Sequence, residues 1–383
     1  MLVFMIYVLS FFMGGTGYML QNKLELFVSN AQAIKKEFTW QNSLTKRLAA
    51  LLYAQEGKRI DCGAIRDCHD IIKRSAGVFS SFRGSMALCV AAMLSLSHNP
   101  QGLFDETLEV YNLLKDAKFR ASDYLVVAVL MIAKHTKNAN HVYVVKRSRD
   151  FYDGLKARNY FRTGHDDYIF AAMFGISELD VSSGTERVVR FYDRMKGEFW
   201  DKNSVQALAQ VLVLGGSGGG SMGGSRGGSV GGSRGGSRGG SREIEDGGGI
   251  GDADGDDLAR LFVLRDAFKE RKFKLDKSYT LPSLGILYLL PVDIDTLIHG
   301  VVDAMYYMKR ERGFSPLSIT KQELLLYAVA SVANEYMENV KDGILTATIT
   351  TSITNLIIAQ QIAMIAAMNS QTAAIAASSS HVF

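Results

Sequence analysis

Two kinds of helical segment alternate along the chain. Segments of the first kind place apolar residues three and four positions apart with charges between them, as in DETLEVYNLLKDAK (105–118) and ERVVRFYDRMKGE (186–198). This spacing predicts amphipathic helices with one buried face. Segments of the second kind, such as DYLVVAVLMIA (123–133) and SVQALAQVLVL (204–214), are apolar nearly all round. Helices of that composition are expected to be buried between their neighbours.

A phenylalanine marks the junction between each amphipathic segment and the apolar segment that follows it. Successive junctions are 44, 37, 42, 38, 74 and 41 residues apart, at Phe38, Phe82, Phe119, Phe161, Phe199, Phe273 and Phe314. The single long interval contains a glycine-rich tract. Residues suited to capping a helix start follow the junctions, among them Ser43, Ser85, Asp123, Asp166, Ser204 and Ser278. One amphipathic and one buried helix in about 40 residues is typical of helical-repeat proteins.

The pattern therefore predicts an all-α fold. We expect an array of about seven helical hairpins, resembling an α-solenoid, with a disordered Gly/Ser/Arg-rich insertion. The chain has only 4 prolines, so helix interiors are rarely interrupted. Of its 37 glycines, 20 lie between Gly215 and Gly255, which leaves few for the many tight turns of a β fold.

Composition divides the chain into five segments. They are an apolar N-terminal extension (1–19), the first part of the repeats (20–214), the Gly/Ser-rich insertion (215–256), the second part of the repeats (257–342), and an uncharged Ala/Ile/Ser-rich helix and tail (343–383). The last segment has too many amide side chains for a membrane span. We expect it to pack on the last repeat of its own chain, with a homo-oligomer formed through this C-terminal helix as the alternative.

The insertion carries two weak chemical patterns. Its spaced arginines (Arg226, Arg234, Arg238, Arg242) could contact single-stranded nucleic acid, but the tract lacks aromatic residues that stack on bases. Asp252, Asp254 and Asp256 are spaced as in a calcium loop, but Asp257 and Val263 stand where that loop requires glycine and glutamate. A solvated linker is favoured. The net charge of +4 also gives no electrostatic reason to expect a nucleic-acid partner.

Cysteine content and the N-terminal segment bear on the compartment. Three cysteines, Cys62, Cys68 and Cys89, do not form a disulfide framework, which favours the cytoplasm. The alternative is a membrane anchor formed by residues 1–20, which carry no charge. The apolar run Met1–Met13 is shorter than the roughly 20 residues of a spanning helix. We interpret residues 1–19 as a non-native or unstructured extension.

One polar cluster could support catalysis. His165, Asp166 and Asp167 combine an imidazole with two carboxylates, a set suited to acid–base chemistry or metal binding. Their structural interpretation, which we favour, is that they cap the helix that begins near Tyr168. Cys62, Cys68 and His69 lack a usual zinc spacing, and no nucleotide-binding or nucleophile motif is found. We therefore expect no cofactor and no metal.

Basic residues follow four of the junction phenylalanines, namely Arg83, Arg120, Arg162 and Lys274. Stacked units would align these charges along one edge, near helix N-termini that favour anions. An anion or an acidic partner could bind there. Acidic residues in the same connectors, such as Asp123 and Asp166, would neutralise the edge locally, so a solvated edge is the favoured interpretation.

The motif FSSFRG (79–84) and the segments EVYNLLK (109–115), DDY (166–168) and LRDAFK (264–269) resemble a bacterial family of unknown function, domain-of-unknown-function family 4003. The resemblance covers roughly Leu20 to Asn339 without the glycine tract. It implies an uncharacterised helical protein of the cytoplasm and supplies no activity, cofactor or catalytic residue.

The sequence leaves the function unknown and favours a non-enzymatic role as a protein-binding or scaffold protein, because stacked hairpins form extended surfaces for partners. One alternative is an enzyme with a polar site around His165, Asp166, Asp167 and Arg83. Another is a membrane-associated helical protein.

The glycine tract offers the first test. The interval from Phe199 to Phe273 has 74 residues, of which Gly215–Gly255 accounts for 41, so the tract reads as one insertion within a continuing repeat. Replacing it with a short Gly-Ser turn should preserve the fold and raise the free energy of unfolding by no more than about 2 kcal/mol, the loop-closure cost. Trypsin should cut first at the tract arginines, and the fragments should stay associated on size exclusion. Fragments that separate without denaturant would indicate two tethered domains.

Overall fold

The computed structural model describes residues 22–77, 80–158, 163–216, 258–273, 280–339, 356–362 and 365. Throughout these residues the regular secondary structure is helical, which confirms the predicted fold class. The N-terminal extension, the junction residue Phe161 and the Gly/Ser-rich insertion beyond Gly216 lie outside the described residues.

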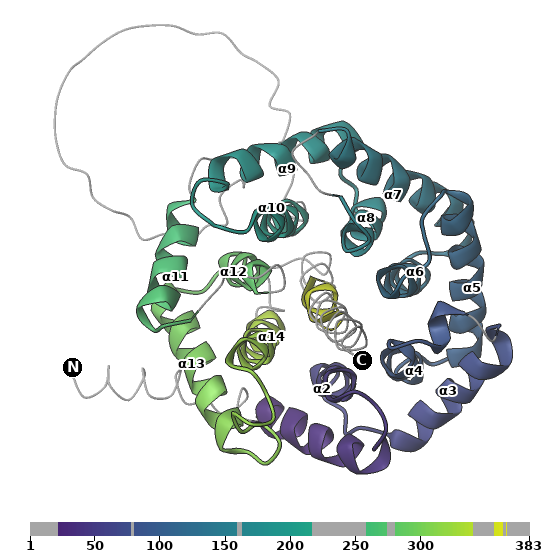
Figure 1. Ribbon diagram of the computed structural model, residues 1–383, viewed down its shortest axis with the longest axis horizontal. Coiled ribbons are helices and arrows are strands. Elements are labelled where there is room, and N and C mark those ends of the chain that lie inside the picture. Colours follow the sequence, from purple (N-terminus) through teal and green to yellow (C-terminus); the bar gives the residue numbers. More distant parts are fainter. Residues whose placement is uncertain are drawn as a thin grey trace, which may run out of the picture.

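The helices form two concentric layers around a closed ring (Figure 1). The outer layer contains the helix of residues 22–37, α3 (Cys62–Ser75), α5 (Pro100–Asp116), α7 (His141–Lys156), α9 (Val181–Met195), α11 (Ala259–Glu270) and α13 (Ile294–Arg310). The inner layer contains α2 (Ser43–Gln55), α4 (Ala87–Ser95), α6 (Asp123–His135), α8 (Asp167–Ile176), α10 (Lys202–Gly216), α12 (Leu281–Tyr288) and α14 (Lys321–Asn339). Short 3₁₀ helices η1 (Ser81–Arg83) and η2 (Asn138–Asn140) precede α4 and α7.

The two sequence patterns correspond to the two layers. The outer helix α3 buries only Ile65, Cys68 and Ile72, whereas every residue of α4 from Ala87 to Leu94 is buried. An outer helix contacts the protein on one face and solvent on the other, so it needs an apolar stripe alone. The inner helices are enclosed by other helices, which explains their nearly continuous apolar composition.

The junction phenylalanines anchor the connections between the layers. Phe82, Phe119 and Phe314 are fully buried, while Phe38, Phe199 and Phe273 are partly buried and pack against the core. The predicted caps are only partly correct, because Ser85 is not the N-cap of α4 and the side chain of Asp166 makes no capping hydrogen bond to α8. At two other inner helices the capping residue lies one position before the predicted one. Asn42 rather than Ser43 accepts from a backbone N–H of α2, and Ser122 rather than Asp123 caps α6.

The array of hairpins closes into a ring, whereas an open solenoid has two free ends. The first hairpin packs directly on the last, because the ring of Phe27 lies 5.5 Å from that of Phe314 and 5.1 Å from that of Tyr327. All three aromatic side chains are fully buried. The last hairpin therefore has a packed neighbour on both sides.

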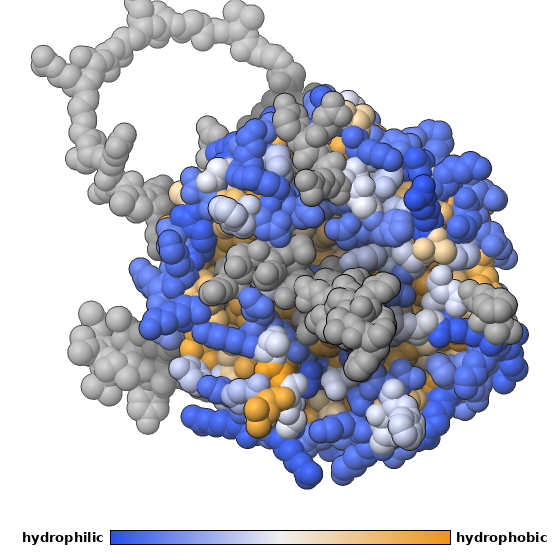
Figure 2. All heavy atoms as spheres, viewed as in Figure 1, coloured by the Kyte–Doolittle hydropathy of each residue, from blue (hydrophilic) through white to orange (hydrophobic). Residues whose placement is uncertain are grey.

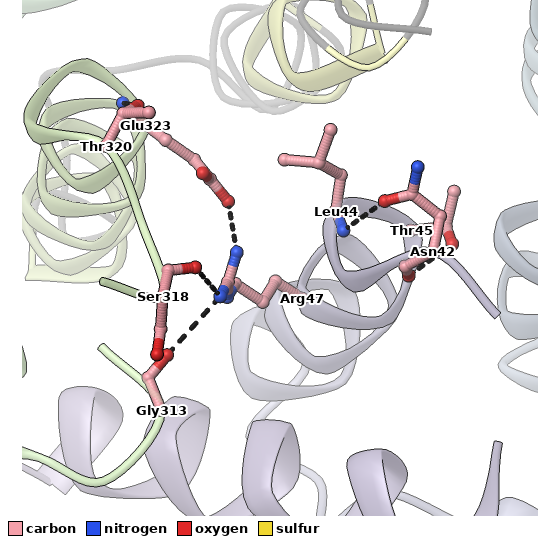
Figure 3. Close-up of polar contacts among 8 residues, drawn as sticks. All are labelled: Asn42, Leu44, Thr45, Arg47, Gly313, Ser318, Thr320 and Glu323. Atoms are coloured by element: carbon pink, nitrogen blue, oxygen red, sulfur yellow. Dashed lines mark hydrogen bonds and ion pairs between the residues drawn. The ribbon is translucent and has the colours of Figure 1, made fainter. Parts of the chain in front are cut away.

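A buried ion pair accompanies this closure (Figure 3). Nη1 of Arg47 on α2 donates to Oε1 of Glu323 on α14 at 2.5 Å. Nη2 of Arg47 donates to the backbone oxygens of Ser318 at 2.6 Å and Gly313 at 3.3 Å. Burial raises the pKa of Glu323, whereas the adjacent charge of Arg47 lowers it and favours the ionised carboxylate.

The repeats on either side of the Gly/Ser-rich insertion are in direct contact. The inner helices α10 and α12 approach so closely at Gly285 that an added Cβ would lie 2.8 Å from Cγ1 of Val211. In the outer layer, Nη1 of Arg265 pairs with Oε2 of Glu198 at 2.7 Å. Helices separated by the long interval in the sequence thus pack as adjacent units.

A further short helix, residues 356–362, lies inside the inner layer (Figure 1). We call it the central helix. All seven of its residues are buried, as is Ile365 beyond it. Gln360 donates a hydrogen bond to Oγ of Ser283 on α12. The uncharged C-terminal segment therefore contributes a helix to the centre of its own ring.

Among the described residues, no helix is both long enough and apolar enough to cross a membrane. The anchor considered for residues 1–20 falls outside that part of the chain.

The closing ion pair should have a large effect on stability. Arg47→Met leaves Glu323 buried without its counter-charge, so the free energy of unfolding should fall by about 3–5 kcal/mol in urea titrations. Replacing both partners, with Arg47→Met and Glu323→Leu, should recover most of that loss.

Lys146→Met provides the matched control, because it removes the exposed pair with Asp150 and should cost less than about 1 kcal/mol. Equal effects of Arg47→Met and Lys146→Met would contradict a structural role for ring closure.

Candidate functional site

The starts of the inner helices gather at one end of the ring. Each hairpin enters its inner helix in the same sense, so consecutive inner helices bring their first residues together. Ser85, ahead of α4, donates a hydrogen bond to the carboxylate of Asp123 at the start of α6. Asp167, the first residue of α8, is likewise bonded to side chains of α10. The polar residues of successive connectors are therefore neighbours in space.

The predicted polar residues of α8 lie in an acidic cluster, which we define as Asp123, Tyr124, His165, Asp166 and Asp167. Burial raises the pKa of Tyr124, and the three carboxylates raise it further through their negative charge. His165 is exposed, and its ring lies 5.2 Å from that of Tyr168. Tyr168 in turn accepts a hydrogen bond from the backbone N–H of Arg120 at 3.2 Å. The cluster is thus built on α6 and α8 together.

Asp167 is the buried member, with 6% of its surface exposed. Its Oδ1 accepts from Nε2 of Gln206 at 2.7 Å and from Nε2 of Gln210 at 3.2 Å. Its Oδ2 accepts from the backbone N–H of Gly164 at 2.9 Å. Burial, reinforced by the charge of Asp166, raises the pKa of Asp167 to about 7, although these three donors act in the opposite direction.

Asp166 has one side open to solvent. The protein around its carboxyl group still removes part of the surrounding water, and this desolvation raises the pKa of Asp166. A carboxyl group with a raised pKa can exchange a proton near neutral pH, the property required of a general acid or base. In Asp167, however, both oxygens already accept hydrogen bonds that join α8 to α10 and to its own connector. Asp166 is the carboxylate of this pair that solvent reaches.

Hydrogen bonds place the side chains of the four residues considered for an enzyme site with different partners. His165, Asp166 and Asp167 are adjacent, whereas Arg83 donates its side-chain hydrogen bond to the backbone oxygen of Lys73 on α3. Of the predicted anion-binding edge, Arg83 is half-buried and Arg120 is exposed. Arg162 and Lys274 lie outside the described residues, so the continuous edge remains a prediction.

Sequence reasoning missed the glutamines that complete the Asp167 site. Gln206 and Gln210 are fully buried and lie four positions apart on α10, so both reach α8 from one face. A signal was present in the sequence. Two amides at helical spacing within a segment expected to be buried all round require polar partners, because a buried amide without them is costly.

The cysteines do not form a metal centre in the described part of the chain. No group of three or more His, Cys, Asp or Glu residues there is arranged to hold a metal ion. Cys62, Cys68 and Cys89 are free thiols. Burial raises the pKa of Cys68 to about 11, and that of Cys89 still further, so both stay protonated and unreactive at neutral pH.

The central helix forms the second part of the candidate site. Its residues Gln360 and Gln361 are buried, with Gln361 completely inaccessible to solvent. Among the described residues, no hydrogen-bond partner reaches either amide atom of Gln361 or Oε1 of Gln210. The interior of the ring therefore contains polar groups whose hydrogen-bonding capacity is only partly used.

Comparison with known proteins identifies one family. A family model described as "Protein of unknown function (DUF4003)" matches residues 30–222 and 252–362. The break between the two matched ranges falls within the Gly/Ser-rich insertion, and the second range includes the central helix. No curated protein and no solved structure matches the chain.

The raised pKa of Asp167 predicts that the stability of the protein depends on pH. The native state holds this proton more tightly than the unfolded chain does, so the contribution of Asp167 to the free energy of unfolding falls as pH rises from about 4 to about 7. The free energy of unfolding of the wild type, relative to that of Asp167→Asn, should therefore fall by about 3 kcal/mol between pH 5 and pH 8 in urea titrations.

Asp180→Asn is the control, because hydrogen bonds from the start of α9 lower the pKa of the exposed Asp180. The difference between the free energies of unfolding of Asp180→Asn and wild type should stay constant between pH 5 and pH 8 and change only in more acidic solution. A flat difference for Asp167→Asn as well would contradict a protonated, buried Asp167.

Proposed function

Since the chain belongs to a family of unknown function, DUF4003, we propose its role from its geometry: it is a non-enzymatic binding protein whose ring holds an uncharged helical segment at its centre. In this structure that segment is the protein's own central helix. The observation that carries the proposal is the complete burial of residues 356–362 among the inner helices.

The chemistry of the central helix suits a segment that can be exchanged. It contains no charged residue, so no ion pair fixes it to the inner helices. Its binding rests on buried apolar side chains such as Leu356, Ile357 and Ile362. The unpartnered amide of Gln361 opposes that binding by about 1–3 kcal/mol, the cost of a buried group without its hydrogen bonds.

The family match supports a shared role for this helix. It extends through Ile362, so the central helix belongs to the family pattern, whereas residues 363–383 and 1–29 lie beyond the matched ranges. A partner that supplies an equivalent helix, whether another protein or a second copy of this chain, could occupy the same position. The closed ring limits such partners to one helical segment of small and apolar residues.

Catalysis at the acidic cluster is supported less well. The hydrogen bonds from Gln206, Gln210 and Gly164 account for both oxygens of Asp167, a pattern expected of a link between hairpins. We also propose the cytoplasm as the compartment, which the three free cysteines support.

The test removes residues 343–383 and adds back a synthetic peptide of residues 354–370. The truncated ring should bind the peptide with one-to-one stoichiometry in calorimetry. A peptide carrying Gln361→Leu should bind about tenfold more tightly, because it lacks the unpartnered amide.

A peptide carrying Ile362→Asp is the matched negative control, since it places a charge at a fully buried position. Equal binding of the Ile362→Asp peptide would rule out the proposed site. A truncated chain that cannot fold would show that the central helix is an obligatory part of the core, and the proposal would then be wrong.

A further inference from the structure

A pocket of about 630 Å³ lies where the last two hairpins meet, and its described lining residues do not include the central helix. Its walls come from the residues after α11, from α13, and from the connector and first turn of α14. The volume is within the range of small-molecule sites. The lining is mainly apolar and includes Phe273, Val302 and Phe314. Figure 2 shows hydrophobic surface on this face over α13 and α14, inside a largely hydrophilic rim.

The equivalent junction elsewhere in the ring is filled by aromatic side chains. Around Phe119, the ring of Tyr168 lies at 4.9 Å and that of Tyr152 at 5.6 Å. The guanidinium carbon of Arg149 covers the same phenylalanine at 5.6 Å. Around Phe273 the neighbours include Phe268 at 5.9 Å and the ammonium of Lys321 at 4.3 Å, and the described side chains leave the pocket beside them unfilled. The pocket thus occupies a position that side chains fill at the Phe119 junction.

Three cations border this apolar space: Arg271, Lys309 and Lys321. Nζ of Lys321 donates to the backbone oxygen of Lys272 at 2.8 Å, which holds its charge beside the ring of Phe273. Arg271 and Lys309 are exposed. Within the described residues, the ion pairs of the protein do not include any of these three cations. Their charge is available to a ligand.

We propose that this pocket binds a monomeric organic anion with an apolar body, such as a medium-chain carboxylate. The apolar body packs between Phe273, Val302 and Pro316, and the anionic head group meets Arg271, Lys309 and Lys321. Burial of the body supplies affinity, and the cations select against neutral or cationic molecules of the same shape. This site is independent of the helix-binding role of the ring.

The test titrates decanoate into the full-length protein by calorimetry. Decanoate should bind at one site per chain, whereas acetate and decyltrimethylammonium should not bind saturably. The double variant Arg271→Ala, Lys309→Ala should weaken decanoate binding at least about tenfold, because charge-assisted contacts are lost. Arg310→Ala removes the adjacent exposed cation that does not line the pocket, and it should change the affinity by less than about twofold.

Val302→Trp should fill the pocket and abolish binding while the circular dichroism spectrum stays unchanged. Three results would overturn the proposal: equally tight binding of decyltrimethylammonium, unchanged affinity in the double variant, or retained binding in folded Val302→Trp. Binding to phosphatidylglycerol vesicles without binding to decanoate would also overturn it, because a membrane surface would then be the ligand. If Val302→Trp fails to fold, the double variant decides the question, since both of its altered side chains are exposed.

Discussion

Contact between the first hairpin and the last is the constraint on which the architecture depends. Phe27, Phe314 and Tyr327 close the apolar core, and Arg47 joins Glu323 to the connector before α14. An open array would leave these aromatic rings at its two ends as exposed apolar surface, and it would separate Arg47 from Glu323. Closure buries them and encloses a central position on all sides. The central helix and the buried amides around it follow from that enclosure.

The hairpins themselves could be predicted because each is specified locally. The outer stripe, the junction phenylalanine and the apolar inner helix recur within about 40 residues, and each feature has a direct physical cause. Closure could not be predicted in the same way, since it depends on a small rotation between units that accumulates around the ring. The last predicted hairpin has Phe314 and an apolar run through Tyr327, so it needs an apolar neighbour. The sequence alone offers the uncharged C-terminal segment for that place as readily as the first hairpin.

Only the part of the candidate site that is local in the sequence could be predicted. His165, Asp166 and Asp167 are consecutive, so their proximity needs no knowledge of the fold. Gln206 and Gln210 lie about 40 residues farther along, and only the packing of α10 on α8 brings them to Asp167. The same limit applies to Arg47 and Glu323, which are 276 positions apart. Long-range polar partners become visible only when the order of the helices around the ring is known.

Closure also changes what a chain terminus means in this fold. Since the hairpin at Phe27 and the hairpin at Tyr327 are packed neighbours, the ring has no structurally terminal unit. The packing of the ring therefore does not determine which hairpin comes first in the sequence. The long insertion between α10 and α11 already separates two packed neighbours in the sequence without separating them in space. In topological terms the protein is a closed circle of packed hairpins, in which the first and the last hairpin are neighbours and a long insertion joins two others.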